Sequence, residues 1–386
     1  MHGINRKVIC CFVAFIFFFQ SFALASARVD EIPFDIHAKS ALLLDGTTGK
    51  ILFSKNPDEK LPVASVTKVM TILLLIEALD KGQLTKTDTV RISEHASGMG
   101  GSQVFLAPNE TFPIVELMKA IVIASANDAS VAMAEKLCGS EELFVKKMNE
   151  RAKQLGMKNT NFLNCTGLPI ANHYSSASDI AMMSRELLKH PTFFNWSTIW
   201  LDHIRNGKTL LTNTNRLVRF YEGADGIKTG STNEALFCLS ATAKRGNLRL
   251  ISIIIGAPTS KIRFAEAQKM LDYGFANYQI VVIVKKNEEV KKQITIINGN
   301  TDHVAGISKD EYAILLKKDE NKTVEKKINV PNTIRAPIKK GQTIGDMTLY
   351  KEGKQIGKVA IITNQDVVAA SLWDNINKII KRWIGK

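Results

Sequence analysis

The stretch Ser65-Val66-Thr67-Lys68-Val69-Met70-Thr71-Ile72-Leu73-Leu74-Leu75-Ile76-Glu77-Ala78-Leu79 decides how the chain around it must fold. Between Val69 and Leu79 only two residues are polar, so a helix formed here is apolar on almost every face. Such a helix is buried inside a domain, because about eleven residues are too few to cross a bilayer. We therefore predict a buried central helix that opens with Ser65 and Lys68.

Strand patterns lie on both sides of this helix in the sequence. Residues 40–45 and 50–54 are predicted to form a hairpin around the turn Gly46-Thr-Thr-Gly49, and residues 235–243 and 248–255 form a second hairpin pattern. A sheet whose strands come from both ends of a domain, with a helical block between them, is an α/β layer arrangement. The helices of this block are expected at residues 114–124, 129–137, 141–155 and 177–188.

Length and charge limit the remaining possibilities. The chain has 386 residues with 45% hydrophobic content, which excludes a disordered tail protein or a disulfide miniprotein and allows two domains. The net charge of +14 is spread too widely to identify a partner, and we predict no nucleic-acid partner. Residues 281–386 carry 20 Lys and Arg against 12 Asp and Glu, and their short β-branched runs indicate a small β domain.

The N-terminal end predicts export. Residues 1–27 combine Arg6 and Lys7, an apolar core of roughly a dozen residues and small residues at Ala23, Ala25 and Ala27, which is the pattern of a cleaved signal peptide rather than a membrane anchor.

The mature chain keeps three cysteines without a C-x-x-C motif, so we expect no disulfide framework. We also expect no metal site and no cofactor, because no Cys/His cluster is present. The expected location is the extracytoplasmic face of the membrane, in a periplasm or on an outer surface.

The C-terminal end, residues 371–386, is amphipathic. Trp373, Ile376, Ile380 and Trp383 follow helical spacing, and Lys and Arg occupy the opposite face. A helix docked on its own domain would also have an apolar face. Two Trp at the edges of a basic helix favour an anionic membrane surface, so we predict a membrane-anchor helix.

Three short motifs could carry chemistry. Ser65 and Lys68 are three residues apart, so their hydroxyl and amine lie on one face of the buried helix. A lysine in that apolar setting should have a lowered pKa and could accept a proton from the serine. Taken alone, a serine followed by a lysine is more often a helix cap.

The other two motifs are equally ambiguous alone. Ser125 and Asn127 fall between two helices, where they could face a cleft or cap the helix that follows. Lys228, Thr229 and Gly230 could offer an ammonium, a hydroxyl and a close backbone approach at a sheet edge. A solvated edge lysine is the simpler interpretation of the third motif.

Together, the three motifs resemble a known family. Ser125 comes 60 residues after Ser65, and Lys228 comes 103 residues after Ser125. This order resembles the active-site triplet of the serine D-alanyl-D-alanine carboxypeptidases, the low-molecular-mass penicillin-binding proteins. The similarity extends to Met99-Gly-Gly-Ser-Gln103 and Gly223-Ala-Asp-Gly-Ile-Lys-Thr-Gly230. It implies a β-lactamase/transpeptidase-like α/β catalytic domain over residues 28–279, a β-rich domain over 280–366 and an anchor helix over 371–386.

The resemblance also implies roles for individual residues. Ser65 would attack the D-Ala-D-Ala carbonyl with Lys68 as base, and the acyl-enzyme would then be hydrolysed, which limits cross-linking. The backbone N–H groups of Ser65 and Ser231 would form the oxyanion hole, although some relatives carry His where this chain has Ser231. Ser125 would relay a proton, Asn127 would hold the substrate amide, and Lys228 would add positive potential. Thr229, Gly230 and Arg263 would bind the substrate, the last through its guanidinium.

Three alternatives remain open at this stage. A β-lactamase uses the same triplet, but one large class also needs a loop glutamate that we do not identify here. A transpeptidase would carry out the same acylation and pass the acyl group to an amine. A non-enzymatic peptidoglycan-binding protein would give no reason for the Ser, Lys, Ser, Asn and Lys residues of the three motifs. The implied partners are pentapeptide stems of peptidoglycan, β-lactam antibiotics as covalent inhibitors, and an anionic membrane surface.

Overall fold

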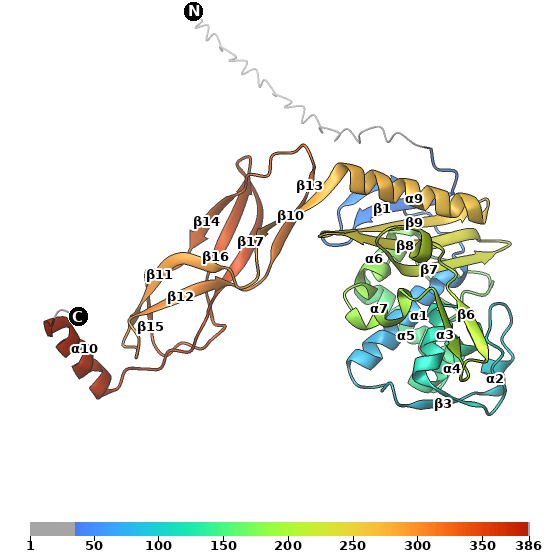
Figure 1. Cartoon of the computed structure of the whole chain (residues 1–386), viewed down its shortest axis with the longest axis horizontal. Coiled ribbons are helices and arrows are strands. Elements are labelled where there is room, and N and C mark those ends of the chain that lie inside the picture. Colours follow the sequence, from blue (N-terminus) through green and yellow to red (C-terminus); the bar gives the residue numbers. More distant parts are fainter. Residues whose placement is uncertain (1–34, 385–386) are drawn as a thin grey trace, which may run out of the picture. The chain divides into compact units, whose positions relative to one another are not determined.

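The computed structural model describes residues 35–384, so the predicted signal peptide lies outside the described residues. The chain separates into Met1–Asp35 and Ile36–Lys386, and the description below concerns the second unit. Its N-terminal part is built on a five-stranded antiparallel sheet in the order β2-β1-β9-β8-β7 (Figure 1). The strands are β1 (Ser40–Asp45), β2 (Ile51–Lys55), β7 (Ala224–Thr232), β8 (Leu236–Arg245) and β9 (Leu248–Ala257).

The sheet joins early strands of the chain to strands that follow the helical block. Strand β1 pairs with β2 on one side and with β9 on the other, where Leu42 lies opposite Ile253. The predicted dependence of the N-terminal hairpin on the later strands is therefore confirmed. Strand β7 pairs only with β8, so it forms one edge of this sheet.

Helices cover both faces of the sheet (Figure 1). Helix α9 (Ser260–Asn277) packs on β8 and β9 from one side, and the helical block packs on the other. The block contains α1 (Lys68–Asp80), α3 (Ile114–Val122), α4 (Asn127–Cys138), α5 (Glu141–Leu155) and α6 (Ala177–Leu187). These bounds agree with the helices predicted from the sequence to within two residues at each end.

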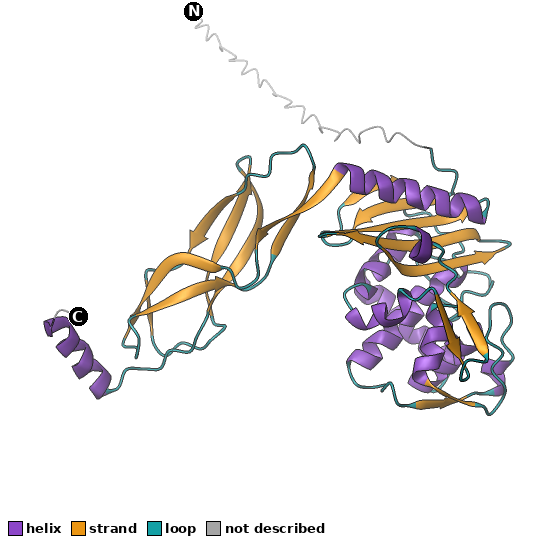
Figure 2. Cartoon of the chain, in the orientation of Figure 1, coloured by secondary structure: helices purple, strands orange, loops and turns teal. Residues whose placement is uncertain are grey.

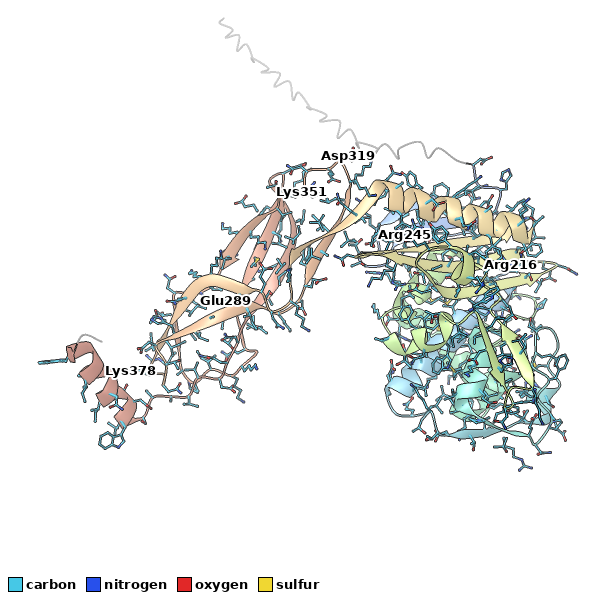
Figure 3. The ribbon with its side chains drawn as sticks, viewed as in Figure 1. Arg216, Arg245, Glu289, Asp319, Lys351 and Lys378 are labelled. Atoms are coloured by element: carbon cyan, nitrogen blue, oxygen red, sulfur yellow. The ribbon has the colours of Figure 1, made fainter. Side chains whose placement is uncertain are left out.

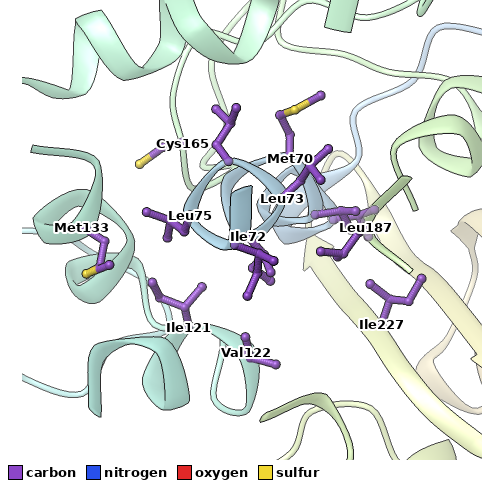
Figure 4. Close-up of a cluster of buried hydrophobic side chains, with 14 of the residues drawn as sticks. Met70, Ile72, Leu73, Leu75, Ile121, Val122, Met133, Cys165, Leu187 and Ile227 are labelled. Atoms are coloured by element: carbon purple, nitrogen blue, oxygen red, sulfur yellow. The ribbon is translucent and has the colours of Figure 1, made fainter. Parts of the chain in front are cut away.

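Helix α1 is the centre of the hydrophobic core. Figure 4 shows its side chains Met70, Ile72, Leu73 and Leu75 surrounded by residues from the neighbouring helices and from the sheet. Eleven residues of α1 are buried, which is why its sequence is apolar on almost every face. The first residue of this helix is Lys68, so the core holds a lysine amine at its edge.

Several short elements were absent from the sequence prediction. They are a 3-10 turn at Ala64–Thr67 and another at Pro191–Phe193, the strands β3 (Thr89–Arg91), β4 (Thr111–Pro113), β5 (Leu201–Ile204) and β6 (Thr209–Thr212), and the short helices α2 (Glu94–Ser97), α7 (Phe194–Ser197) and α8 (Leu217–Phe220). Each spans at most four residues, which is too short for a hydrophobic period to be seen.

From Tyr278 onward the chain is β-rich, as Figure 2 shows. A six-stranded sheet has the order β14-β16-β17-β12-β11-β15, and β10 pairs with β13. A separate hydrophobic core, which includes Val284, Ile294, Leu349 and Ile361, supports these strands. The strands are β10 (Tyr278–Val284), β11 (Glu289–Ile297), β12 (His303–Ser308), β13 (Tyr312–Lys317), β14 (Glu325–Asn329), β15 (Thr333–Arg335), β16 (Thr343–Lys351) and β17 (Lys354–Thr363).

The last element is α10 (Leu372–Ile384). Its apolar side chains Trp373, Ile376, Ile380 and Trp383 are exposed, while Lys378 pairs with Asp302 at 2.5 Å. Between residues 35 and 384 no helix has both the length and the apolar character needed to cross a membrane.

Candidate active site

Ser65 and Lys68 meet where the 3-10 turn joins helix α1. The Lys68 Nζ donates to the Ser65 Oγ at 3.0 Å. The residue before the serine, Ala64, has a φ of 48°, a left-handed backbone conformation that non-glycine residues rarely adopt. The N-cap residues of this turn and of α1 are Val63 and Thr67, so Ser65 caps neither element and the helix-cap interpretation is wrong. The tight turn instead directs the serine hydroxyl toward the lysine amine.

Lys68 is completely buried, and its amine has a defined set of partners. Besides Ser65, its Nζ donates to Asn127 Oδ1 at 2.5 Å and to the backbone oxygen of Thr166 at 2.8 Å. Burial disfavours the ammonium and lowers the pKa of Lys68 to about 7, against a weaker raising effect of Cys165 and Asp128. Since two acceptors hold two N–H bonds, the lone pair of the neutral amine is left for the Ser65 proton.

Ser125 and Asn127 lie at the start of helix α4. The N-cap of this helix is Ala126 and makes no side-chain cap bond, so Ser125 is not the cap. Ser125 has a φ of 67° and lines the same cavity as Ser65. Within residues 35–384 its hydroxyl makes no hydrogen bond. Strained backbone at a residue that faces a cleft is typical of a functional site.

The Asn127 amide organises the cleft wall. Its Oδ1 accepts from Lys68, its Nδ2 donates to the Gly100 oxygen at 2.7 Å, and its backbone N–H donates to the Ser102 oxygen at 2.7 Å. One N–H of the amide remains for another acceptor. Ser102 itself lines the cavity, although the sequence analysis assigned it no role.

A loop that the sequence analysis did not assign to the site completes the surroundings of Lys68. Gly167 has a φ of 81°, and a Cβ there would lie 1.9 Å from the Ala64 oxygen. The loop is also attached through His173, whose Nδ1 accepts from the Leu163 N–H and whose Nε2 lies 2.8 Å from the Thr67 Oγ1. Burial lowers the pKa of His173 to about 4, so this ring is neutral at neutral pH. The loop thereby fixes the Thr166 oxygen against Lys68.

Strand β7 forms the opposite wall of the cleft. Lys228 is buried, and its pKa is well below the usual lysine value because of burial and of the nearby positive charges of Lys68 and Arg263. The solvated-lysine interpretation is therefore wrong. The Thr229 hydroxyl donates to Thr214 Oγ1 at 2.7 Å. A Cβ on Gly230 would lie 2.8 Å from the Ser65 nitrogen, so this glycine lets the turn Ala64–Thr67 touch the strand.

Arg263 lines the cleft from the first turn of helix α9. Its Nη1 donates to the backbone oxygens of Gly230 and Cys238, both at 3.3 Å, and its Nη2 donates to Ser260 Oγ at 3.1 Å. Its Nε is buried without a hydrogen-bond partner. Burial lowers the pKa of Arg263 to about 10, so the guanidinium stays charged at neutral pH. Within residues 35–384 no carboxylate is within ion-pair distance of it.

These residues surround one cavity of about 720 Å³, a size suited to a small peptide. Of the predicted site residues, Ser65, Ser125, Thr229, Ser231 and Arg263 line it, as does Gly230. Three further predicted residues are buried next to the cavity without lining it: Lys68, Asn127 and Lys228. Lys68 is hydrogen-bonded to both Ser65 and Asn127. Lining residues that the sequence analysis did not predict come from distant segments: Ser102, Trp200, Thr212, Asn213, Thr214, Arg216, Phe220, Phe237, Ser260 and Phe264.

Comparison with known proteins identifies this arrangement. Residues 25–259 match the D-alanyl-D-alanine carboxypeptidase family, peptidase S11. The chain belongs to this family. It is a serine-type D-alanyl-D-alanine carboxypeptidase of the penicillin-binding-protein fold, which confirms the fold class and the enzyme activity that the motif triplet implied. Residues 278–369 match the C-terminal domain of penicillin-binding protein 5, in agreement with the predicted β domain that follows.

Individual relatives of the carboxypeptidase cover almost all of the chain. The D-alanyl-D-alanine carboxypeptidase DacF of Bacillus subtilis is 46% identical over 360 residues, which are 92% of each protein. Penicillin-binding protein 5 of Haemophilus influenzae is 32% identical, with a TM-score of 0.73 over 87% of this chain and 99% of that one. Penicillin-binding protein D2 of Listeria monocytogenes, solved in its ampicillin-bound form, is 31% identical, with a TM-score of 0.57 over 62% of this chain and 98% of that one.

A second cluster of polar side chains lies away from the carboxypeptidase cleft. Glu77, Glu186 and His190 bring potential metal-ligand atoms within 4.8 Å of one another. However, Arg151 already pairs with Glu77 at 2.7 Å and with Glu186 at 2.9 Å. The guanidinium supplies the positive charge that a cation would bring, so this cluster is an ion-pair network that joins α1, α5 and α6.

Proposed function

We propose that Ser65 is the nucleophile of this carboxypeptidase and that Lys68 is its general base. Support comes from the 3.0 Å contact between Ser65 Oγ and Lys68 Nζ together with the complete burial of Lys68, and this is the observation that carries the proposal. A buried amine with a pKa of about 7 is half neutral at physiological pH. It can then accept the serine proton as the hydroxyl oxygen attacks the carbonyl of the D-Ala-D-Ala bond.

The acylation step follows from this arrangement. Ser65 Oγ forms an ester with the carbonyl carbon of the penultimate D-alanine, and the peptide C–N bond breaks. Ser125 relays a proton to the departing amine, for which its unpaired hydroxyl, in the same cavity as Ser65, is well suited. Water then hydrolyses the ester, and the shortened peptide leaves with a new carboxylate. Asn127 holds Lys68 and contributes its remaining N–H to the substrate amide.

The oxyanion is proposed to form at the contact between the nucleophile turn and β7. The backbone N–H groups of Ser65 and Ser231 are the assigned donors. Gly230 brings these two segments together, because any side chain on it would meet the Ser65 nitrogen. A donor pair built from backbone needs no reorganisation when negative charge develops, so it stabilises the transition state more than the ground state.

The terminal carboxylate of the substrate is assigned to Thr229 and Arg263. A buried guanidinium without a carboxylate partner is costly, and an incoming carboxylate compensates that cost. The same anion would favour the ammonium form of Lys228, which burial first and then the nearby charges of Lys68 and Arg263 destabilise. This part of the cleft would therefore bind a substrate whose last residue, D-alanine, has a free C-terminal carboxylate.

The substrate class and location complete the proposal. The enzyme would act on pentapeptide stems of peptidoglycan outside the cytoplasm and be acylated by β-lactams. Trp373, Ile376, Ile380 and Trp383 on α10 would lie in the interface of an anionic membrane, since this apolar face is exposed. Residues 28–279 would be the catalytic domain, 280–366 the β domain and 371–386 the anchor.

Release of D-alanine tests the assignment. A diacyl-Lys-D-Ala-D-Ala peptide is incubated with protein that lacks residues 1–27 and 371–386, without an amine acceptor. We expect D-alanine release, and at least a thousandfold loss in the Ser65→Ala variant, on the order of the cost of removing a catalytic nucleophile. Release only with an added amine would indicate a strict transpeptidase, and rapid turnover of penicillin would indicate a β-lactamase. Equal release by Ser65→Ala would disprove the mechanism.

A further inference from the structure

The hairpin of β5 and β6 connects the catalytic cavity with the loop of residues 100–106, which we call the 100–106 loop. Trp200 and Thr212, at the open end of the hairpin, line the cavity. Arg205 begins the turn at the other end and has a φ of 54°, in the left-handed region. Arg216, labelled in Figure 3, also lines the cavity, whereas Arg205 does not. An effect of Arg205 on catalysis therefore has to pass through other residues.

The guanidinium of Arg205 uses all five of its N–H bonds, and two of them bind the backbone of the 100–106 loop. Nη1 donates to the Val104 oxygen and Nη2 to the Phe105 oxygen, both at 2.7 Å. The remaining N–H bonds point to the two carboxylate oxygens of Glu110, each at 3.2 Å, and to Thr209 Oγ1 at 3.4 Å. A planar guanidinium that binds two successive carbonyl groups holds them in one orientation. Arg205 therefore fixes the outer side of the loop.

The hairpin is attached to helix α3 by contacts that do not involve this guanidinium. The backbone N–H of Arg205 donates to Glu116 Oε2 at 3.0 Å, and Asp202 pairs with Lys119 at 2.7 Å. Glu116 and Lys119 belong to α3, whose apolar residues pack in the hydrophobic core. Loss of the Arg205 side chain would therefore release the loop and leave the hairpin in place.

The inner side of the 100–106 loop lies against Asn127. Asn127 donates from its Nδ2 to the Gly100 oxygen and from its backbone N–H to the Ser102 oxygen, both at 2.7 Å. Gly101 has a φ of 76°, and a Cβ there would lie 2.8 Å from Asn127 Nδ2. The Oδ1 of the same amide accepts from Lys68. The position of the loop therefore sets the position of the amide that holds the Lys68 amine.

Val104 links the two sides of the loop. Its N–H donates to Asp128 Oδ2 at 3.1 Å, and its oxygen accepts from Arg205. The Leu106 N–H donates to the same carboxylate oxygen at 3.1 Å. Asp128 is completely buried and follows Asn127 in helix α4. Because a carboxylate binds N–H donors strongly, a shift of Val104 is transmitted to the residue next to Asn127.

We propose that Arg205 is a positioning residue of the carboxypeptidase, which acts on Lys68 through the 100–106 loop and Asn127. The inference rests on the proposed role of Lys68 as the general base. With the guanidinium in place, the loop keeps the Asn127 amide on the Lys68 amine, and the amine stays aimed at Ser65. Without it, the loop keeps its contacts with α4 but loses its outer support. The amine then lies less well for proton transfer.

This mechanism separates chemistry from substrate binding. Thr229 and Arg263, the assigned carboxylate site, come from β7 and α9 and make no hydrogen bond to the 100–106 loop within residues 35–384. Loss of the Arg205 side chain should therefore slow the acylation step and leave the affinity of the first complex nearly unchanged.

The first test measures these two quantities. Stopped-flow acylation of the full mature chain by a fluorescent penicillin gives the rate constant at saturation and the dissociation constant of the first complex. In Arg205→Ala we expect the rate constant to fall by about ten- to a hundredfold and the dissociation constant to change by less than about twofold. A protein that is only less stable would instead label a smaller fraction of its molecules at the wild-type rate.

Two further variants separate the loop contacts from the ion pair. Arg205→Lys keeps the positive charge with less risk to folding, but its single ammonium does not replace a planar fork on two carbonyls, so the rate constant should still fall by at least about fivefold. Glu110→Gln is the matched control, because it removes the ion pair and leaves both backbone contacts of Arg205. Its rate constant should stay within about twofold of wild type.

The second test observes the loop directly. Hydrogen–deuterium exchange at the N–H groups of Val104 and Leu106 should be at least about tenfold faster in Arg205→Ala than in wild type. Residues 201–204 and 209–212 of the hairpin should exchange as in wild type, since their contacts with α3 remain. Unchanged exchange in the loop would show that Arg205 does not hold it.

The outcomes also distinguish this inference from the proposed function. A wild-type rate constant in Arg205→Ala, or an equal fall in Glu110→Gln, would overturn the positioning role and leave the proposed function intact. A wild-type protein that penicillin does not acylate would reject the proposed function and this inference with it.

Discussion

The Nζ of Lys68 lies 2.5 Å from the Oδ1 of Asn127, and this contact orients the amine that we propose as the general base. The amide oxygen accepts one N–H of the lysine without adding a negative charge. The Thr166 oxygen accepts another N–H in the same way. Both contacts orient the amine, while burial keeps the pKa of Lys68 near 7. A neutral acceptor at position 127 is therefore a requirement of the mechanism.

The variant Asn127→Asp tests that requirement. A carboxylate in contact with Lys68 favours the ammonium, so the pKa of Lys68 should rise and the acid limb of acylation should move upward by at least about one pH unit. Acylation by a fluorescent penicillin at pH 7 should fall by about tenfold or more. Asn206→Asp, at the exposed turn between β5 and β6, adds the same charge and should have no effect. A normal rate in Asn127→Asp at pH 7 would show that Lys68 is not the base.

The acylation rate of the wild-type enzyme should depend on pH in a defined direction. Only the neutral amine of Lys68 can accept the serine proton, so the rate falls as pH decreases through about 7, the pKa of Lys68. Below pH 6 we expect about a tenfold loss for each pH unit. Stopped-flow measurement of penicillin acylation between pH 5 and 9 gives the profile. A rate independent of pH over pH 5–7 would argue against this base.

Most of the fold could be predicted from the sequence because long elements have clear apolar patterns. The 13-residue helix α1 and the 15-residue helix α5 show unambiguous apolar patterns. The turn at Ala64–Thr67 and the helix α8 do not, since their shape depends on contacts with the rest of the domain. Local periodicity carries no information about such contacts.

The motif residues that the structure brings together at the cleft could also be predicted, but their surroundings could not. Ser65, Lys68, Ser125, Asn127 and Lys228 belong to short motifs with recognisable spacing. By contrast, the Thr166 oxygen is a backbone atom, and its contact with Lys68 spans 98 positions in the sequence. Arg216 is one of many basic residues until folding places it beside the cleft. Positions of this kind depend on tertiary packing rather than on a motif.

Gly230 should tolerate no side chain. A Cβ at this position would lie 2.8 to 2.9 Å from the Ser65 nitrogen, the Val63 oxygen and the Val66 nitrogen. Gly230→Ala should push the turn Ala64–Thr67, which carries Ser65, away from strand β7 and lower the acylation rate by about a hundredfold. Gly100→Ala is the matched control, because its Cβ would meet nothing within 4 Å. Circular dichroism checks that both variants fold, and equal acylation rates would contradict the proposed contact.

The helix α10 should bind anionic vesicles. Its exposed Trp373 and Trp383 suit the membrane interface, so replacing both by Glu should abolish sedimentation of the mature chain with vesicles that contain anionic lipid. Asn375→Glu with Asn377→Glu adds the same two charges to the helix but keeps both indoles, and it should bind more tightly than the Trp variant. Unchanged vesicle binding after loss of both Trp side chains would show that the apolar face of α10 is not the membrane-binding surface.

The most direct test of the central claim is to locate the penicillin adduct. The mature protein is labelled with penicillin, digested and analysed by mass spectrometry, in parallel with Ser65→Ala and Ser125→Ala. The mechanism predicts one adduct on Ser65, no label in Ser65→Ala, and slow labelling still on Ser65 in Ser125→Ala. An adduct on Ser125 or another residue, or full labelling of Ser65→Ala, would contradict the assignment of Ser65 as the nucleophile.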